Sequence, residues 1–441
     1  MSFVPIEETR IQREIDAMGF DPKRLAIREL KKLVENLEKT CDNTFIRMEF
    51  GIPNLPTPEV AVEAEIRALR EESVQSQYPP FDGIPILKEQ AAAFVRNFLD
   101  IDVEPLHCMP TCGAMQGGFV AQILGARMHK GRNTILYLEP SFPVNKLQAQ
   151  FFGLNVESID FYDHRGETLI QAVRERVAQG DVGAVIWSSP NNPSWICLTQ
   201  DELDGLAEVG NEHDVLMIED LAYFGMDLRK DVMNPGVAPY QPSIGQKGKT
   251  WVILLSGSKL FSYAGQRVGL MIVSPDLAKR RFADLEEHFG SDRLLHAFMH
   301  GGVYCSTAGV THSGQHGLAA LLKAANAGER SYMDNIHEYA TRAKWLKQCF
   351  LRHGFSLVYD NDLGEPIADG FYFTVSWPGL SGSELQFELL RYGISMITLE
   401  ITGSKRVEGL RACVSFTDSS CFEAMEERLE SFARSQATIT A

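Results

Sequence analysis

The chain has 441 residues, of which 44% are hydrophobic and 23% are charged, a composition typical of a globular protein with a large apolar core. This length predicts two or three domains. The formal net charge of −16 argues against a nucleic-acid partner, because proteins that bind phosphate backbones carry an excess of lysine and arginine.

The N-terminal residues lack the apolar stretch of a signal peptide. No apolar run approaches the roughly 20 residues that a membrane helix requires. The eight cysteines are dispersed and form no CxxC motif, so neither a zinc ribbon nor a disulfide framework is indicated. We therefore expect a cytoplasmic protein with reduced thiols.

The first predicted elements are helices separated by a loop. Residues 11–40 are rich in Glu, Lys, Arg and Leu and predict a helix. The three prolines of residues 50–60 predict a loop or linker, and residues 59–72 predict another helix. We expect residues 1–55 to pack with the C-terminal part of the chain.

Strands and helices then alternate. Five short apolar runs bounded by polar residues, Gly or Pro predict buried parallel strands at residues 133–140, 183–190, 215–220, 251–256 and 268–274. Between them, residues 113–129 have helical spacing of apolar residues, and Thr199 with Glu202 is a capping-box signature. This alternation predicts an α/β domain over residues 56–320, with a mostly parallel sheet flanked by helices.

The pattern changes after about residue 325. A long helix is expected at residues 331–354, two strands at 370–378 and 411–416, and a final helix after them. Residues 321–441 therefore predict a smaller α+β domain, completed by the N-terminal segment.

Chemically useful side chains directly follow the predicted strands. Phe142, Asn191, Asn192, Asp220 and Lys259 each stand just beyond or at the end of an apolar run. Alone, each has an ordinary explanation as a turn, cap or packing residue. Because ligands of open α/β sheets bind beyond the carboxyl ends of the strands, the combination predicts a site on that edge.

Two nucleotide motifs and two histidine pairs fail closer inspection. Residues 245–250 (GQKGKT) lack the first glycine of a P-loop and precede a strand, and residues 113–118 (GAMQGG) do not match GxGxxG. His296/His300 and His312/His316 have helical spacing, but zinc requires three or four ligands and no HExxH is present. We expect no metal site.

The strand-end residues suit pyridoxal phosphate. A lysine amine condenses with its aldehyde, and a carboxylate beside the ring nitrogen keeps the ring protonated, so that the ring can accept electrons. Phe142 offers a ring that stacks on one face of the cofactor. The phosphate requires a helix N-terminus, hydroxyl groups and a cation, which Gly113, Ser256, Ser258 and Arg267 offer.

Residues 256–269, SGSKLFSYAGQRVG, resemble the Ser-x-Ser-Lys-x-Phe-x-x-x-Gly-x-Arg-x-Gly signature of the class I and II aminotransferases, fold type I enzymes that use pyridoxal phosphate. The resemblance extends from MEFGIPNLPTP to GLRACVSF, nearly the whole chain. It implies transfer of an amino group between an L-amino acid and a 2-oxo acid.

The resemblance also implies roles for the matching residues. Lys259 is expected to bind the cofactor aldehyde and later to move the proton at the substrate α-carbon. Asp220 is expected to pair with the ring nitrogen, and Tyr223 and Asn192 with the ring oxygen. The full set of implied cofactor-binding residues is Gly113, Ala114, Met115, Phe142, Asn192, Asp220, Tyr223, Ser256, Ser258, Lys259, Arg267 and Tyr78.

Two further motifs concern the partner subunit and the substrate. Tyr78, in YPPFDG, is expected to reach the phosphate of a neighbouring subunit, which implies a homodimer. Arg411, in GLRACVSF, is expected to bind the substrate α-carboxylate in bidentate fashion, with Gly51 and Asn192 nearby. The family often has Asn-Pro-x-Gly, and this chain has Trp195 in place of that glycine.

Two other functions remain open from the sequence. A carbon–sulfur β-lyase or a decarboxylase on the same fold would carry the same motifs. A ligand-sensing regulator would need a DNA-binding module, and the roughly fifty residues before the family region are not conspicuously basic. Arg293 stands in a plausible region for binding an acidic side chain but has no motif around it.

Overall fold

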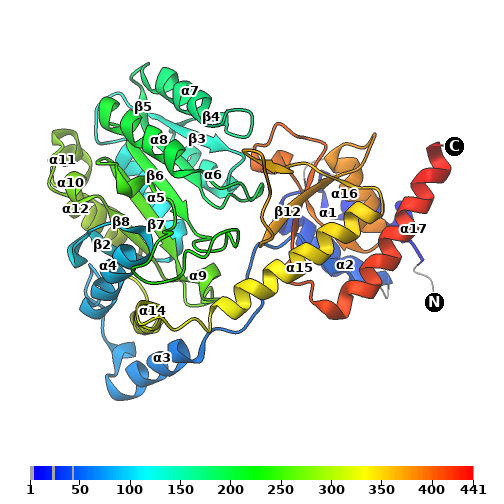
Figure 1. Cartoon of the computed structure of the whole chain (residues 1–441), viewed down its shortest axis with the longest axis horizontal. Helices are drawn as coiled ribbons and strands as arrows, with labels where there is room; N and C mark the ends of the chain where they lie inside the picture. The colour runs from blue at the N-terminus through cyan, green and yellow to red at the C-terminus, as the bar shows by residue number, and fades with distance from the viewer. Residues whose placement is uncertain (1–3, 22–24, 42–43, 441) are drawn as a thin grey trace. The chain divides into compact units, whose positions relative to one another are not determined.

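The computed structural model describes residues 4–21, 25–41 and 44–440 (Figure 1). The chain divides into two compact units. Unit 1 consists of residues 1–54, 192–196 and 336–441, and unit 2 of residues 55–191 and 197–335. Met1–Phe3 and Ala441, the ends of the first and last expected domains, lie outside the described residues. The domain boundaries expected from the sequence stay a prediction.

Unit 2 is built on a sheet in which, among the described residues, seven strands follow the order β2-β8-β7-β6-β5-β3-β4 (Figure 1). In chain order the strands are β2 Cys108–Thr111, β3 Thr134–Glu139, β4 Asn155–Asp160, β5 Val182–Ser188, β6 Leu216–Leu221, β7 Trp251–Ser256 and β8 Gly269–Val273. β8 is antiparallel to both of its neighbours, and the other pairs are parallel. The mostly parallel sheet expected from the sequence is confirmed.

The prediction of a parallel strand at residues 268–274 is wrong in direction. Parallel strands need a crossover of a dozen or more residues, usually with a full helix. Residues 257–268, which connect β7 to β8, contain only the four-residue helix α9 Gly257–Leu260. The chain therefore turns back beside β7 rather than crossing over the sheet.

Helices cover both faces of this sheet. The longer ones are α3 Glu59–Glu71, α4 Pro85–Leu99, α5 Gly113–Gly125, α6 Pro143–Phe151, α7 Glu167–Val177, α8 Gln200–His213 and α14 His312–Asn326. Shorter ones are η1 Val74–Ser76, η2 Pro105–His107, η3 Ile244–Gln246, α10 Pro275–Ala278, α11 Ala283–Phe289, α12 Leu294–His296, the π-helix η4 Ala297–Tyr304 and α13 Cys305–Thr307.

Alternating residues of β6 show how the faces are used. Leu216 and Ile218 join the core formed with α5, whereas Met217 lies beside Gly210 of α8 on the opposite face. The capping box at the start of α8 is confirmed, because Thr199 accepts a hydrogen bond from the Glu202 backbone and the Glu202 side chain accepts one from the Thr199 backbone. The face of β6 that carries Leu216 and Ile218 also carries Asp220.

Unit 1 combines an antiparallel sheet with helices. Its strands are β1 Ile46–Arg47, β9 Ser356–Leu357, β10 Asn361–Asp362, β11 Glu365–Pro366, β12 Tyr372–Ser376, β13 Ile394–Ser395, β14 Ile397–Thr398 and β15 Leu410–Cys413. Its helices are α1 Glu8–Met18, α2 Ile27–Cys41, α16 Gly382–Arg391, η5 Glu400–Thr402, η6 Ser419–Cys421, α17 Phe422–Thr440 and the part of α15 Met333–Arg352 from residue 336 onward. The four-stranded sheet has the order β14-β15-β12-β9.

The N-terminal segment belongs to this unit. β1 pairs in parallel with β13, and buried residues of α1 and α2 form one core with Leu390 and Ile397. The expected packing of the N-terminal segment with the C-terminal part is therefore confirmed. The single helix expected over residues 11–40 is wrong, because α1 ends at Gly19, which has a left-handed φ of 65°.

Across residues 4–21, 25–41 and 44–440, no helix is both long enough and apolar enough to cross a bilayer.

Candidate active site

The strand ends of unit 2 bring the expected cofactor residues to one edge of the sheet. Ser188 of β5 and Leu254 of β7 flank Asp220 in the register of the sheet. Gly269 of β8 stands opposite Ser256 on one side and Thr111 on the other. The register of these strands thus places the segments that begin α5 and α9 at the same edge as Asp220.

Lys259 lies on the short helix α9, which starts directly after β7. Ser256 is the N-cap of α9, and its Oγ accepts a hydrogen bond from the Ser258 N–H at 3.1 Å. The Lys259 side chain is half-buried, and its Nζ lies 6.0 Å from the centroid of the Tyr223 ring. The lysine and the tyrosine expected at the site therefore lie close together.

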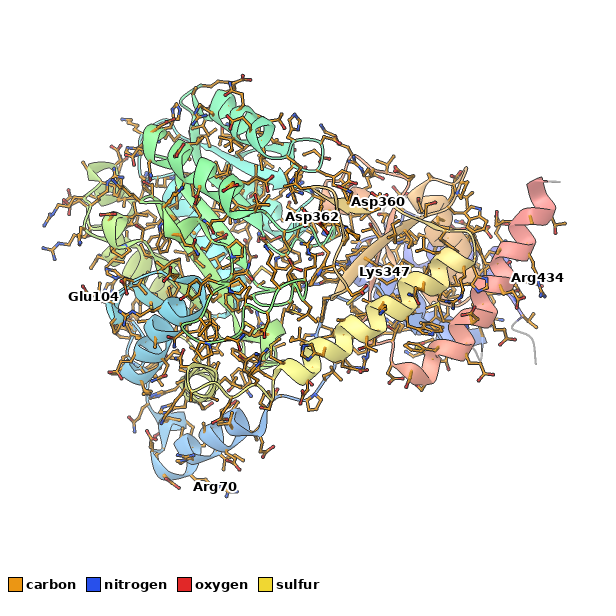
Figure 2. The ribbon with its side chains drawn as sticks, viewed as in Figure 1. Arg70, Glu104, Lys347, Asp360, Asp362 and Arg434 are labelled. Carbon is orange, nitrogen blue, oxygen red and sulfur yellow. The ribbon has the colours of Figure 1, made fainter. Side chains whose placement is uncertain are left out.

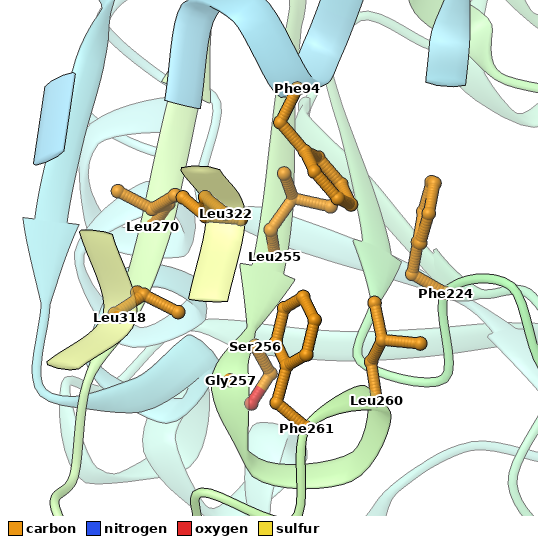
Figure 3. A pocket seen from close by; sticks show the side chains of 10 residues that line it. All are labelled: Phe94, Phe224, Leu255, Ser256, Gly257, Leu260, Phe261, Leu270, Leu318 and Leu322. Atoms are coloured by element: carbon orange, nitrogen blue, oxygen red, sulfur yellow. The ribbon is translucent and has the colours of Figure 1, made fainter. Parts of the chain in front are cut away.

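An apolar cluster anchors the turn that carries Lys259. Figure 3 shows Leu260 and Phe261, on either side of this turn, among the rings and aliphatic chains of the cluster. The residues that line it are Phe94, Phe224, Leu255, Ser256, Gly257, Leu260, Phe261, Leu270, Leu318 and Leu322. The cavity of about 10 Å³ between these side chains is a small packing gap with apolar walls. The apolar cluster therefore holds α9 in place.

Asp220 has the environment of a carboxylate that needs a cationic partner. It is half-buried by surface area, and its Oδ1 accepts a hydrogen bond from the Ala222 N–H at 2.9 Å. Desolvation raises the pKa of Asp220 to about 6, against the smaller opposite effect of the Ala222 N–H. A protonated ring nitrogen placed beside this carboxyl would stabilise its charged form.

The N-terminus of α5 meets Arg267 at a glycine. Gly113 has a φ of 70°, and a Cβ atom there would lie 2.7 Å from Nη2 of Arg267. Arg267 itself is exposed, and its Nη1 donates to the Ala264 carbonyl at 3.1 Å. A guanidinium beside the free N–H groups of Ala114 and Met115 at a helix start suits a phosphate.

Gln116 is a neighbour of this helix start that the sequence analysis missed. Its Oε1 accepts a hydrogen bond from the Cys112 N–H at 2.7 Å, and its Nε2 donates to Ser306 Oγ at 2.8 Å and to Thr307 Oγ1 at 2.9 Å. Gln116 thus caps α5 and ties it to the turn after the π-helix. Gln116 is the fourth residue of α5, one position beyond the Glu or Gln of a capping box, and Cys112 is not the Ser or Thr of that motif, so no capping signature marked it.

The expected carboxylate-binding residues gather in unit 1. Arg411, on β15, is 2% exposed. Its Nη1 donates to Asn192 Oδ1 at 3.0 Å and its Nη2 to the Glu49 carbonyl at 2.6 Å. Among the described residues, no carboxylate lies within 4.0 Å of this guanidinium, and its buried Nε has no hydrogen-bond partner. A buried cation without a counter-charge favours an anionic ligand.

Tyr372 and Glu49 complete the surroundings of Arg411 and were not anticipated from the sequence. The Arg411 Cζ lies 4.5 Å from the centroid of the Tyr372 ring. Gly51 fits against the same tyrosine, because a Cβ atom at position 51 would overlap the Tyr372 hydroxyl. The buried Glu49 carboxylate accepts hydrogen bonds from Ser395 Oγ and Arg47 Nε, which fixes the segment whose carbonyl holds Arg411.

The positions of Phe142 and Tyr78 say less about a role in binding the cofactor. Phe142 is the half-buried N-cap residue of α6, just after β3. Tyr78 is 81% exposed and lines a surface hollow with Phe81, His312 and His316. This position keeps Tyr78 available to another molecule. Apart from Tyr78 and Asn192, the expected cofactor residues lie at the ends of the strands of unit 2, on the segments that follow those strands or on the segment before β8.

These residues fit pyridoxal phosphate. No cation of the described part of the chain pairs with the carboxyl of Asp220, and Gly113 leaves room for Arg267 beside the start of α5. Lys259 extends from the turn between them in the register of the sheet. The donor set therefore matches an aldehyde, a ring nitrogen and a phosphate.

A separate cluster in unit 1 contains possible metal ligands. Cys349 Sγ and His353 Nε2 lie 3.1 Å and 2.9 Å from the Glu426 carboxylate, and Arg352 donates to it at 2.7 Å. Burial acts to raise the pKa of Glu426, but these hydrogen bonds outweigh it and lower the pKa to about 2. The guanidinium already supplies the positive charge, so the cluster is an ion-pair network. The expectation of no metal site stays a prediction.

Comparison with known proteins gives a consistent result. The sequence profile of the family described as aminotransferase class I and II matches residues 44–427. A probable aspartate aminotransferase of Methanocaldococcus jannaschii is 26% identical over 258 residues, which cover 58% of this chain and 62% of that protein. An LL-diaminopimelate aminotransferase of Gloeobacter violaceus is 27% identical over 353 residues, which cover 74% of this chain and 85% of that protein. The chain spans about three-fifths of the length of the first of these curated relatives.

Solved structures show the same fold. The aspartate aminotransferase from Thermus thermophilus with maleate superposes with a TM-score of 0.72 at 20% identity, covering 96% of this chain and 98% of that chain. An aminotransferase from Mycobacterium tuberculosis superposes with a TM-score of 0.73 at 20% identity, covering 94% of this chain and 97% of that chain.

Proposed function

Because this chain belongs to the class I and II aminotransferase family, whose members of the aspartate aminotransferase type use pyridoxal phosphate, we propose that it transfers an amino group between an L-amino acid and a 2-oxo acid. Pyridoxal phosphate, when bound, supplies an aldehyde that condenses with amines and a protonated ring that accepts electrons from the adjacent carbon.

The chain's own residues divide the remaining work. Lys259 Nζ would hold the aldehyde and would move the proton at the substrate α-carbon. Asp220 would keep the ring nitrogen protonated, and Tyr223 would donate a hydrogen bond to the ring oxygen. The start of α5, Ser256, Ser258 and Arg267 would hold the phosphate. This assignment is supported by the positions of these residues at one edge of the sheet.

The observation that carries the proposal for the substrate is the state of Arg411. Arg411 is 2% exposed, and its guanidinium has no carboxylate partner among the described residues. Both substrates of an aminotransferase carry a carboxylate next to the reacting carbon, and a planar guanidinium binds such a group in bidentate fashion. One site of this kind serves the amino acid and the oxo acid alike.

The test is turnover with a panel of amino donors, aspartate and diaminopimelate included because relatives carry those names, and 2-oxoglutarate as acceptor. We expect one oxo acid to form for each amino acid formed. Lys259→Ala should lose turnover, by at least about a thousandfold, while it still binds the cofactor non-covalently, because it lacks the proton-transferring amine. Lys130→Ala, which removes an exposed lysine of the same unit, should retain turnover.

Other products would overturn this proposal. Release of pyruvate and ammonia from cysteine or cystathionine, with no oxo acid required, would identify a β-lyase. Release of carbon dioxide would identify a decarboxylase. A protein that takes up no cofactor and shows no visible absorbance band would contradict the assignment altogether.

The homodimer and the cellular location are part of the proposal. Tyr78, Phe81 and Tyr304 are large residues with exposed fractions of 81%, 43% and 41%, and the rings of Phe81 and Tyr304 pack edge to face at 4.5 Å. An exposed aromatic surface of this kind supports an interface with a second copy of the chain. The cytoplasmic location expected from the sequence stays a prediction.

A further inference from the structure

The loop after β5 carries an unusual residue conformation. Residues 192–196 belong to unit 1, and Trp195 is fully buried there with a φ of 64°. This left-handed conformation is unfavourable for a side chain with a Cβ atom, and glycine is the residue that normally adopts it. A tryptophan at this position requires compensating contacts around its ring.

Those contacts are made with the segment that leads into β12. The indole lies against Gly370, where an added Cβ atom would overlap three atoms of the ring. It also meets the Tyr372 ring edge-on, with 5.9 Å between the ring centroids. Position 370 therefore has to be glycine for this indole to occupy its place.

The segment before Gly370 is fixed independently. Lys347, labelled in Figure 2, extends from α15 and donates to the carbonyls of Ile367 and Ala368 at 3.2 Å and 3.4 Å. Its Nζ also pairs with Asp369 at 2.5 Å. The indole thus packs against a part of unit 1 that is already held in place.

Two routes lead from Trp195 to Arg411. Through the backbone, Trp195 fixes the loop that carries Asn192, whose Oδ1 accepts a hydrogen bond from Arg411 Nη1. Through space, it packs against Tyr372, whose ring lies under the Arg411 guanidinium. The orientation of both groups around the guanidinium therefore depends on one side chain.

We infer that Trp195 is a positioning residue that orients Asn192 and Arg411 for the substrate carboxylate, with Gly370 as its obligatory partner. This inference rests on the proposed function, because it assigns the carboxylate of the amino or oxo acid as the ligand of Arg411. It predicts an effect on substrate affinity that is separate from cofactor binding, since the cofactor residues other than Asn192 lie in unit 2 or, for Tyr78, on its surface.

The test is a double-mutant cycle on the cofactor-loaded protein with Trp195→Gly, Gly370→Ala and the double variant. Each single substitution should raise the KM for both substrates by about tenfold or more, with kcat changed by less than about threefold. The double variant should match Trp195→Gly alone, because an alanine at 370 meets no indole there. Trp195→Phe should recover part of the affinity.

A second readout does not need turnover. Propionate, which carries the carboxylate and no reacting amine, should bind more weakly to the Trp195→Gly variant by a similar factor, while the dissociation constant for pyridoxal phosphate stays within about threefold. Trp377→Ala is the matched control: Trp377 packs on Phe355 and Phe432 in the same unit, so its loss should lower the thermal midpoint without changing propionate affinity.

The outcomes separate this inference from the proposed function. Unchanged KM and propionate affinity in Trp195→Gly, or an effect of Gly370→Ala that is equal in both backgrounds, would overturn the role of Trp195. Absence of amino transfer by the unsubstituted protein would overturn the proposed function instead, and the propionate measurement would still report on Trp195 and Arg411.

Discussion

Glu219 and Asp220 are neighbours in β6 whose side chains point to opposite faces of the sheet. Glu219 is fully buried, and its Oε2 accepts hydrogen bonds from Ser243 Oγ at 2.6 Å and from the Ile244 N–H at 3.2 Å. Burial raises the pKa of Glu219 to about 8 and outweighs these hydrogen bonds. At neutral pH the side chain is therefore largely a neutral acid, on the face away from Asp220.

This carboxyl makes stability depend on pH. The folded protein keeps the Glu219 proton up to about pH 8, whereas the unfolded chain releases it near its ordinary pKa of 4.5. Between these values the folded state binds more protons, so its stability falls as the pH rises, by up to about 1.4 kcal/mol per pH unit. Glu219→Gln should remove this contribution.

The measurement is the thermal midpoint from pH 5 to pH 8, with cofactor in constant excess. The advantage of Glu219→Gln over the unsubstituted protein should grow with pH. Asp201→Asn, at an exposed carboxylate of α8, is the control and should run parallel to the unsubstituted protein. Parallel curves for Glu219→Gln would show that Glu219 has an ordinary pKa.

Single residues also show which features of the site can be predicted from the sequence. Lys259 and Asp220 were placed at the sheet edge because each directly follows or ends an apolar run, and local sequence determines that position. Trp195, Gly370 and Tyr372 were not connected, because they lie far apart in the chain and meet only in the folded unit. No local periodicity reports such a contact.

At the scale of elements, the start of α5 is the feature with the clearest steric requirement. Gly113→Ala adds a Cβ atom 2.7 Å from Arg267 Nη2, so the guanidinium must move away from the helix start. We expect the dissociation constant for pyridoxal phosphate to rise by about tenfold or more, measured by titration of the apoprotein.

Gly153→Ala is the matched control for this substitution. Gly153 has a φ of 66°, close to that of Gly113, but no atom of the described residues lies within 4 Å of an added Cβ. Both alanines carry the same backbone strain of about 1–2 kcal/mol, and only the one at 113 displaces Arg267. Equal cofactor affinity in the two variants would show that Arg267 takes no part in binding the phosphate.

The strands and helices differ in how closely the sequence predicted them. β5, β6 and β7 are apolar on both faces because helices cover both, and each was expected within two residues of its observed bounds. β4 was missed because it is an edge strand with mostly exposed side chains, and β2 because it is short and contains Pro110. The break after α1 was marked by Gly19 and went unrecognised.

At the scale of the whole molecule, the predicted dimer makes the site a shared one. If Tyr78 binds the phosphate held by the partner subunit, a dimer of one Lys259→Ala subunit and one Tyr78→Phe subunit contains one intact site. The Tyr78→Phe subunit supplies the lysine of that site, and the Lys259→Ala subunit supplies the tyrosine. The two variants are unfolded or dissociated, mixed and allowed to pair. At cofactor concentrations that saturate only the intact site, we expect the activity of the mixture to rise toward a quarter of the activity of the unsubstituted protein.

The controls are each variant alone and a mixture of Lys259→Ala with the unsubstituted protein. If Tyr78 acts within its own subunit, mixing produces no site better than that of the Tyr78→Phe protein, and the shared-site assignment fails. A monomer at working concentrations would exclude it directly.

The interleaving of the two units has a consequence for synthesis on the ribosome. The apolar faces of α1 and α2 are covered in part by Leu390 and Ile397, which are translated almost the whole chain later. At 5–20 residues per second, about 20 to 80 seconds separate the emergence of these partners. Unit 2 is translated between these partners and is continuous in sequence except for residues 192–196. It is therefore free to fold before α1 and α2 meet Leu390 and Ile397. The nascent chain therefore exposes the apolar faces of α1 and α2 during most of its translation.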